Sequence, residues 1–133
     1  MIASPQDLAD TTSTRVPGVI AVYLFGSRAR GDGGKQADID LALLTDVPLA
    51  PVARWELQED LAALAHADVD LVDLLRASTV MRVQVLRDAQ LLLDRNPSRR
   101  IAFETMALSA YARLNEERRA ILDDIVRRGR VYA

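Results

Sequence analysis

The chain of 133 residues contains no cysteine, and Lys35 and His66 are its only lysine and histidine. Without cysteine it can form neither disulfide bonds nor zinc–thiolate sites, which is compatible with the reducing cytoplasm, where we expect the protein. No apolar run reaches the roughly eighteen residues of a membrane span, and no secretory leader is visible, so we expect neither a span nor export. The net charge of −2 argues against a broad basic face, so we expect no direct nucleic-acid binding.

The most informative part of the sequence begins with an apolar run, Val19 to Phe25. Its β-branched and aromatic residues show no helical period, which predicts a buried strand. Gly26 ends this strand, and Ser27 is a good N-cap for one helical turn over Arg28–Arg30, which Gly31 closes. Free backbone N–H groups at the start of such a turn, flanked by two arginines, predict a place that holds phosphate.

A second apolar run, Ala37 to Leu44, contains Asp38 and Asp40. In a strand, side chains two positions apart point to the same face. Neighbouring carboxylates repel each other, and Mg²⁺ relieves that repulsion by binding carboxylate oxygens together with substrate phosphates. Ten residues separate Ser27 from Asp38, enough for a helical turn and a return loop. We therefore expect the phosphate corner and the acids to meet at one end of neighbouring strands.

The pattern Gly26-Ser27, ten residues, then Asp38-Ile39-Asp40 resembles the signature of the DNA polymerase β-like nucleotidyltransferase superfamily. The surrounding residues FGSRARG…DIDLALL are most similar to its smallest branch, the minimal nucleotidyltransferase (MNT) domains. Members of that branch are commonly antitoxins of HEPN-domain ribonuclease toxins. The resemblance is specific over residues 19 to 44, fair over 67 to 95 and weak beyond. Ala37 departs from the family, which often has serine there.

A third group of acids lies in residues 67 to 75, ADVDLVDLL, which we predict to form a strand. Asp68 and Asp70 fall on one face of this strand and Asp73 on the other. The resemblance implies a third metal-binding carboxylate on the adjacent strand, which can also accept the proton of the attacking hydroxyl. Asp70 best matches that position, and Asp68 is the alternative. We expect Asp73 to meet solvent or an arginine.

The rest of the chain reads mainly as helix. We expect helices at about 6–12, 52–66, 79–88 and 99–128, and a short edge strand at 90–94. His66 suits the C-terminal end of its helix better than a catalytic role. The last helix carries an apolar stripe from Phe103 to Ile125, with more apolar residues beside it. That extra surface packs within the domain or against another protomer or a toxin, and both interpretations stay open.

The predicted fold class is α/β, a minimal polymerase β-like palm with a small mixed sheet of about four strands, flanking helices and a long C-terminal helix. We expect one domain over 1–133, with a catalytic core of about 16–95 and a helical segment of about 97–130.

The resemblance implies that ATP is the substrate, bound through Gly26, Ser27, Arg28 and Arg30, and that two Mg²⁺ ions are held by Asp38, Asp40 and Asp70. It further implies an antitoxin that adenylylates a tyrosine of a cognate HEPN toxin. Two alternatives remain: a non-catalytic antitoxin that acts by binding and occlusion, and a small-molecule nucleotidyltransferase of the aminoglycoside-modifying type. A homo- or hetero-oligomer formed through the C-terminal helix is a further expectation.

Overall fold

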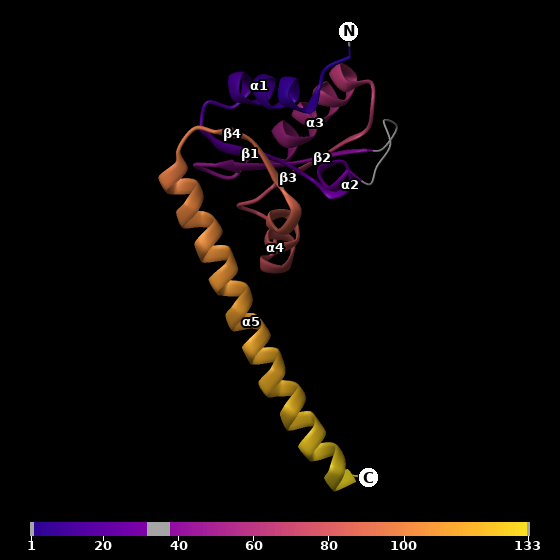
Figure 1. The fold of residues 1–133 in the computed structure, drawn as a ribbon, viewed down its shortest axis with the longest axis vertical. Helices are drawn as coiled ribbons and strands as arrows, with labels where there is room; N and C mark the ends of the chain where they lie inside the picture. The colour runs from indigo at the N-terminus through magenta and orange to yellow at the C-terminus, as the bar shows by residue number, and fades with distance from the viewer. Residues whose placement is uncertain (1, 32–37, 133) are drawn as a thin grey trace.

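The computed structural model describes residues 2–31 and 38–132. Its elements are α1 (Pro5–Arg15), β1 (Val19–Phe25), α2 (Gly26–Arg30), β2 (Ile39–Thr45), α3 (Pro51–Ala65), β3 (Val69–Asp73), α4 (Thr79–Asp88), β4 (Gln90–Asp94) and α5 (Pro97–Tyr132). The strands form one mixed sheet in the order β3-β2-β1-β4 (Figure 1). β1 pairs antiparallel with β2 and β4, whereas β2 and β3 run parallel. The predicted α/β class and four-stranded mixed sheet are confirmed.

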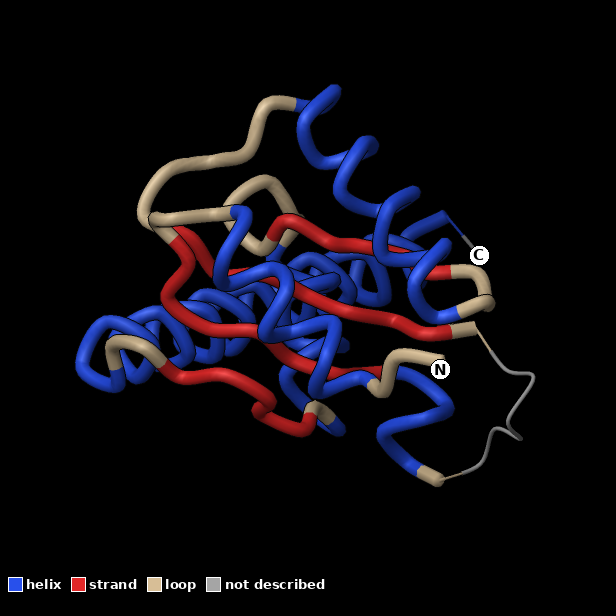
Figure 2. The backbone as a smooth tube through the Cα atoms, turned by 90° about the horizontal axis from the view of Figure 1, so that it is seen from above, coloured by secondary structure: helices blue, strands red, loops and turns tan. Residues whose placement is uncertain are grey.

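Helices cover both faces of the sheet, α1 and α3 on one side and α4 with the start of α5 on the other (Figures 1 and 2). Alternate residues of β2 divide between the two resulting cores. Leu41 and Leu43 pack in the α1/α3 core, whereas Ala42 and Leu44 pack in the α4/α5 core. Because side chains alternate along a strand, Asp40 belongs to the α4/α5 face. Asp40 therefore lies on that face, as the second residue of β2.

The helix boundaries follow local capping signals that are legible in the sequence. The Ser4 hydroxyl accepts the Asp7 N–H at 3.2 Å, and the Asp7 carboxylate accepts the Ser4 N–H at 2.9 Å, which forms a capping box. The Ser78 hydroxyl caps α4 by accepting the Met81 N–H. At the end of α3, His66 adopts the left-handed conformation with φ 50°, so its predicted capping position is confirmed.

The last helix, α5, has 36 residues and extends well beyond the body of the protein (Figure 1). Phe103 and Ala107 are buried near its start, whereas Ile121 and Ile125 further along are 59% and 57% exposed. The predicted apolar stripe therefore packs against α4 and the sheet in its first turns. Within the described residues, no helix is both long and apolar enough to cross a membrane.

A small polar network fixes the start of α5 to the sheet. The Arg100 guanidinium forms ion pairs with Asp94 at 3.0 Å and with Glu104 at 2.9 Å. The Tyr23 hydroxyl of β1 donates to Glu104 at 3.2 Å. Burial, followed by the adjacent Glu104 carboxylate, raises the pKa of Tyr23, so the phenol stays protonated as a donor. Arg100 thus joins α5 to β4, and Glu104 joins α5 to β1.

We predict that Arg100→Met lowers the free energy of unfolding by about 1–3 kcal/mol, because two half-buried carboxylates lose their counter-ion. Urea unfolding followed by circular dichroism measures the change. Arg99→Met is the matched control, since Arg99 is the exposed neighbour on the same helix, and it should change stability by about 0.5 kcal/mol or less. Equal effects of the two substitutions would show that the network does not anchor α5.

Candidate active site

The turn after β1 is built on a glycine. Gly26 is the first residue of α2 and has φ 75°, a left-handed value that favours glycine. The N-cap position is Phe25, without a side-chain cap, so the prediction that Ser27 caps this helix is wrong. The helix begins two residues earlier than predicted, which puts Ser27 inside the first turn. The predicted closure by Gly31 is confirmed, with φ 77° and its N–H donated to the Arg28 carbonyl at 3.3 Å.

Gly26 also lies directly against an acid of the neighbouring strand. In the β1–β2 ladder, Phe25 is the partner of Asp40. A Cβ added to Gly26 would collide with the Asp40 Oδ2 and would lie 3.1 Å from its Cγ. The absence of a side chain therefore lets the Asp40 carboxylate sit beside the start of α2. The predicted meeting of phosphate corner and acids at one sheet end is confirmed for this pair.

Three acids gather at this end of the sheet. β2 begins at Ile39, so Asp38 precedes the strand, and the predicted strand start at Ala37 lies outside the described residues. Asp70 is the direct partner of Asp40 in the parallel β2–β3 register. Burial, then Asp70 and then Asp38 raise the pKa of Asp40, and Arg30 lowers it. The structure thus brings four predicted residues together, namely Arg30, Asp38, Asp40 and Asp70.

This set of carboxylates fits a hard cation chemically. Oxygen donors are the ligands that Mg²⁺ prefers. A cation would offset both the burial of the Asp40 charge and its repulsion by Asp70 and Asp38, which together raise the pKa of Asp40. In the parts of the chain that the structure describes, no three His, Cys, Asp or Glu side chains are already arranged to hold a metal ion. Asp38 and Asp70 are both exposed.

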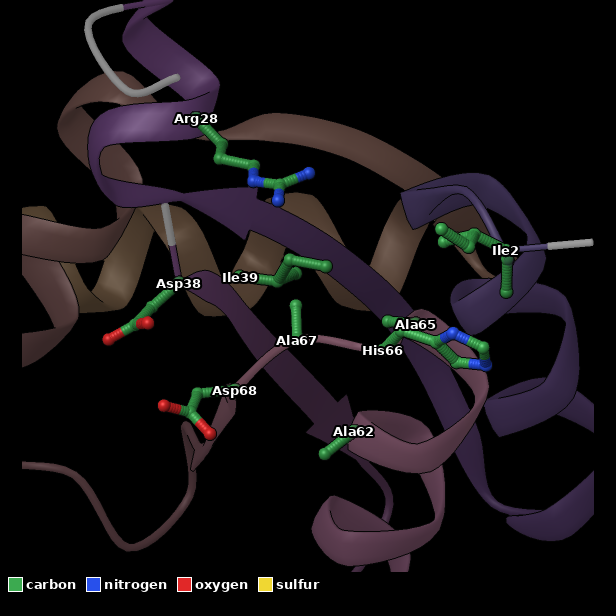
Figure 3. A pocket seen from close by; sticks show the side chains of 10 residues that line it. Ile2, Arg28, Asp38, Ile39, Ala62, Ala65, His66, Ala67 and Asp68 are labelled. Carbon is green, nitrogen blue, oxygen red and sulfur yellow. The ribbon is translucent and has the colours of Figure 1, made fainter. Parts of the chain in front are cut away.

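A large cavity of about 760 Å³ adjoins the acids (Figure 3). Arg28 points into it from α2, and the Asp38 and Asp68 side chains extend together at one end. Ile2 and His66 line the other end. The alternative acid Asp68 thus lies beside this cavity. The charges acting on the Asp40 pKa, however, are those of Asp70, Asp38 and Arg30, which favours Asp70 over Asp68 as the third acid of the cluster.

A second cavity, of about 310 Å³, lies between α2 and α4. Its lining residues are Phe25, Gly26, Arg30, Met81, Gln84, Arg87 and Asp88. Arg30 contacts Asp88 in an ion pair at 3.9 Å, and both side chains are exposed by 40% or more. The α4 residues of this cavity were not foreseen from the sequence. Their spacing of three and four positions, which puts Met81, Gln84 and Asp88 on one helical face, is the signal that could have found them.

Asp73 has a structural role that corrects the prediction. Its side chain is 3% exposed, so the expected contact with solvent is wrong. Oδ2 accepts the Leu49 N–H at 2.9 Å and Oδ1 accepts the Leu75 N–H at 3.0 Å. The Arg76 Nε lies 3.7 Å from the Asp73 Oδ2, so the other expectation, contact with an arginine, is confirmed. The physical reason is that the loop before α3 folds back over the end of β3, where its N–H groups need an acceptor.

Comparisons with known proteins agree with this geometry. The family model described as polymerase beta, nucleotidyltransferase matches residues 6–98. A protein adenylyltransferase MntA of Shewanella oneidensis is 40% identical over 111 residues, which cover 84% of this chain and 79% of that protein.

Two solved structures are similar over almost the whole chain. A crystal structure of a toxin–antitoxin with AMP-PNP has a TM-score of 0.81 at 35% identity, covering 92% of this chain and 99% of the other. A structure of a tri-AMPylated Shewanella oneidensis HEPN toxin in complex with MNT antitoxin has a TM-score of 0.72 at 36% identity, covering 91% and 98% of the two chains. The matched part of this chain is in both cases longer than residues 1–96, which precede α5. Both similarities therefore extend into α5.

We predict that Gly26→Ala is more damaging than Gly31→Ala. Both glycines have left-handed φ values, so each substitution costs about 1 kcal/mol in backbone strain. A Cβ at Gly31 meets open space, whereas one at Gly26 collides with Asp40. Chemical denaturation should therefore show an additional loss of about 1 kcal/mol or more for Gly26→Ala. Equal losses for the two variants would mean that the turn and the acid do not touch.

We predict that Asp40→Asn stabilises the metal-free protein at neutral pH. Because the folded state raises the Asp40 pKa, ionisation of Asp40 disfavours folding. The contribution of Asp40 to the free energy of unfolding is therefore largest below the ordinary pKa of 3.8 and falls as pH rises through the raised pKa.

Melting temperatures of parent and variant in a chelator, measured across pH, test this prediction. The gain should be present at neutral pH and vanish in acid. Asp73→Asn is the control and should lower the free energy of unfolding by roughly 1–3 kcal/mol, because the Asp73 carboxylate accepts two N–H groups. A loss of stability in Asp40→Asn at neutral pH would refute the repulsion.

Proposed function

Since the chain belongs to the polymerase β nucleotidyltransferase family, and to the protein adenylyltransferase branch within it, we propose that it transfers AMP from ATP to a hydroxyl group of a cognate HEPN-family toxin. The toxin then loses its activity, so the chain acts as its antitoxin. ATP as donor is supported by the similar toxin–antitoxin structure with AMP-PNP. A toxin as acceptor is supported by the similar antitoxin whose HEPN partner carries three AMP groups.

We assign the triphosphate of ATP to the turn between β1 and α2. The N–H groups at Gly26 and Ser27, together with the Ser27 hydroxyl, donate to its phosphate oxygens. Arg30, whose charge already acts on Asp40, neutralises phosphate charge there. Arg28 points into the larger cavity and is a second candidate for this role (Figure 3). The packing of Gly26 against Asp40 supports these roles most directly, because it ties the phosphate turn to the acids.

We assign metal binding to Asp38, Asp40 and Asp70. Bound Mg²⁺, as one or two ions, would neutralise developing charge on the phosphates and draw the acceptor hydroxyl and ATP together. To Asp70, the acid opposite Asp40 in the sheet register, we also assign acceptance of the proton of the attacking hydroxyl. The hydroxyl oxygen forms a bond to the α-phosphorus, and the bond from that phosphorus to the bridging oxygen breaks. Pyrophosphate leaves with the electron pair, and the acceptor keeps AMP.

We assign recognition of the toxin in part to the outer half of α5. Its exposed apolar residues there are Ile121, Leu122, Ile125 and Val126, each 57% to 61% exposed. Apolar surface of this size on an extended helix suits a protein partner, either the toxin or a second copy of the chain. The same surface favours the second candidate function, in which binding alone blocks the toxin and no chemistry is needed.

Catalysis and occlusion are separated by stoichiometry. Purified toxin is mixed with about one twentieth of its molar amount of this protein, together with ATP and Mg²⁺. The toxin is then separated from this protein, its mass is measured by mass spectrometry, and its ribonuclease activity is assayed. We predict added AMP on a toxin tyrosine and loss of ribonuclease activity, because a covalent mark persists after the proteins part. Asp38→Ala and Asp40→Ala should each reduce transfer at least about a hundredfold. Asp70→Asn should lose most of it, whereas Asp68→Asn should retain it.

A toxin that gains no mass, yet is silenced by an equimolar amount of the Asp38→Ala/Asp40→Ala double variant, would establish occlusion as the function. Retained transfer in Asp70→Asn with loss in Asp68→Asn would instead exchange the roles of these two acids. Asp70 in β3 and Asp68 just before it are both exposed, so we expect neither substitution to unfold the protein. An unchanged circular dichroism spectrum of each variant checks this.

A further inference from the structure

The side of α5 turned away from the sheet carries a row of residues that recur at alternating steps of four and three positions. This solvent-facing row consists of Ile101, Thr105, Leu108, Ala112, Asn115, Arg119, Leu122 and Val126. Ile101 and Leu108 are each 53% exposed, in the same turns in which Phe103 and Ala107 are buried. Further along, Leu122 and Val126 are 61% and 57% exposed. Apolar side chains of this row therefore lie in solvent from the start of the helix to its outer half.

The spacing of the solvent-facing row is that of a seam between two helices. Alternating steps of four and three average 3.5 residues, the repeat at which one helix packs along another over several turns. Leu108 and Leu122 occupy one of the two positions of each repeat, and the smaller Ala112 and Val126 occupy the other. The row therefore fits a second helix better than it fits a small molecule.

The outer half of α5, residues 116–129, is exposed throughout. The ion pair of Arg128 with Asp124, at 3.2 Å, joins residues of the same helix. A helix of this length is only marginally stable in water unless an apolar face packs against something. A partner helix along the solvent-facing row would supply that packing.

We propose that a second copy of this chain covers the solvent-facing row, with the two α5 helices packed antiparallel about a two-fold axis near residue 117. Leu108 of one copy then lies opposite Val126 of the other, and Ala112 lies opposite Leu122. Each large side chain thus meets a smaller one, which fills the space between the helices. The same layers recur on the other side of the axis, because the two copies are identical.

The polar residues in the middle of the row fit this arrangement. Within the described ranges 2–31 and 38–132, the side chains of Glu116 and Arg119 form no ion pair or hydrogen bond. In the antiparallel pair, Arg119 of each copy lies opposite Asn115 of the other and next to its Glu116, so two opposite-charge contacts form at the centre. Like charges also approach, Glu116 with Glu116 and Arg118 with Arg118, but at the margins of the pair, where solvent screens them.

Other arrangements of the two helices place the charge of Arg119 unfavourably. Parallel helices would set the two Arg119 side chains against each other. A shift of the antiparallel pair by one repeat would set Arg119 opposite Leu108 or Leu122, where a guanidinium group finds no acceptor. Arg119 thus selects both the orientation and the register of the pair.

The second copy occupies only one side of α5. Ile121 and Ile125 continue the sheet-packing row of Phe103 and Ala107 on the other side of the helix, and they stay exposed in the pair. They remain available to the toxin of the proposed function. Self-association needs neither toxin nor nucleotide, so it is tested apart from AMP transfer.

Sedimentation equilibrium of the full chain, without toxin or nucleotide, tests the proposal. We expect reversible dimers in the micromolar range. Leu122→Glu should weaken the association at least about tenfold, because each copy then brings a charge into the seam. Ile121→Glu is the matched control, since Ile121 is the adjacent residue, is 59% exposed and lies on the other row. It should change the association less than about twofold. A monomeric chain, equal effects of the two substitutions, or association only after toxin is added would each overturn the proposal.

Cysteine cross-linking tests the orientation, because the chain has no cysteine of its own. Chains carrying Ala112→Cys and chains carrying Leu122→Cys are mixed and oxidised. The two should form a disulfide with each other at least about tenfold faster than either forms with itself. Preferential disulfides between like chains would show parallel helices and overturn the arrangement. Dimers that form no disulfide in any mixture would place the contact elsewhere on the chain and overturn it as well.

Discussion

The close approach of Gly26 to the Asp40 carboxylate is the contact on which the candidate active site depends. It fixes the start of α2 beside an acid of β2, and only a residue without a side chain permits it. The pairing of Phe25 with Asp40 in the antiparallel ladder sets the two strands at the required register. A shift of one residue in that register would turn Asp40 to the opposite face and into an apolar core.

The fold holds the carboxylates of the acid cluster close together although they repel one another. Asp40 and Asp70 face each other because β2 and β3 run parallel, joined by the crossover helix α3. Burial first, and then repulsion by Asp70 and Asp38, raises the pKa of Asp40. Buried leucines of β2 and β3 on the other face, including Leu41 and Leu71, outweigh it. Apolar packing on one face of the sheet thus stabilises strands whose other face carries the candidate site.

The two cavities divide the surroundings of this site. Asp38 and Asp68 line the first, whereas Gly26 lines the second, between α2 and α4. The free outer half of α5, by contrast, is remote from the chemistry and is available to a partner protein (Figure 1).

The sequence by itself determined the elements whose signals are local: the strand Val19–Phe25, the helix after Ser78 and the edge strand at 90–94 all have the predicted bounds. The spacing of the acids also predicted their cluster. Only the tertiary structure decided that Asp73 is a buried acceptor and that Arg87 faces the turn after β1. Those facts depend on loops and helices that meet across the fold, and no pattern within one segment records which distant segment will pack against it.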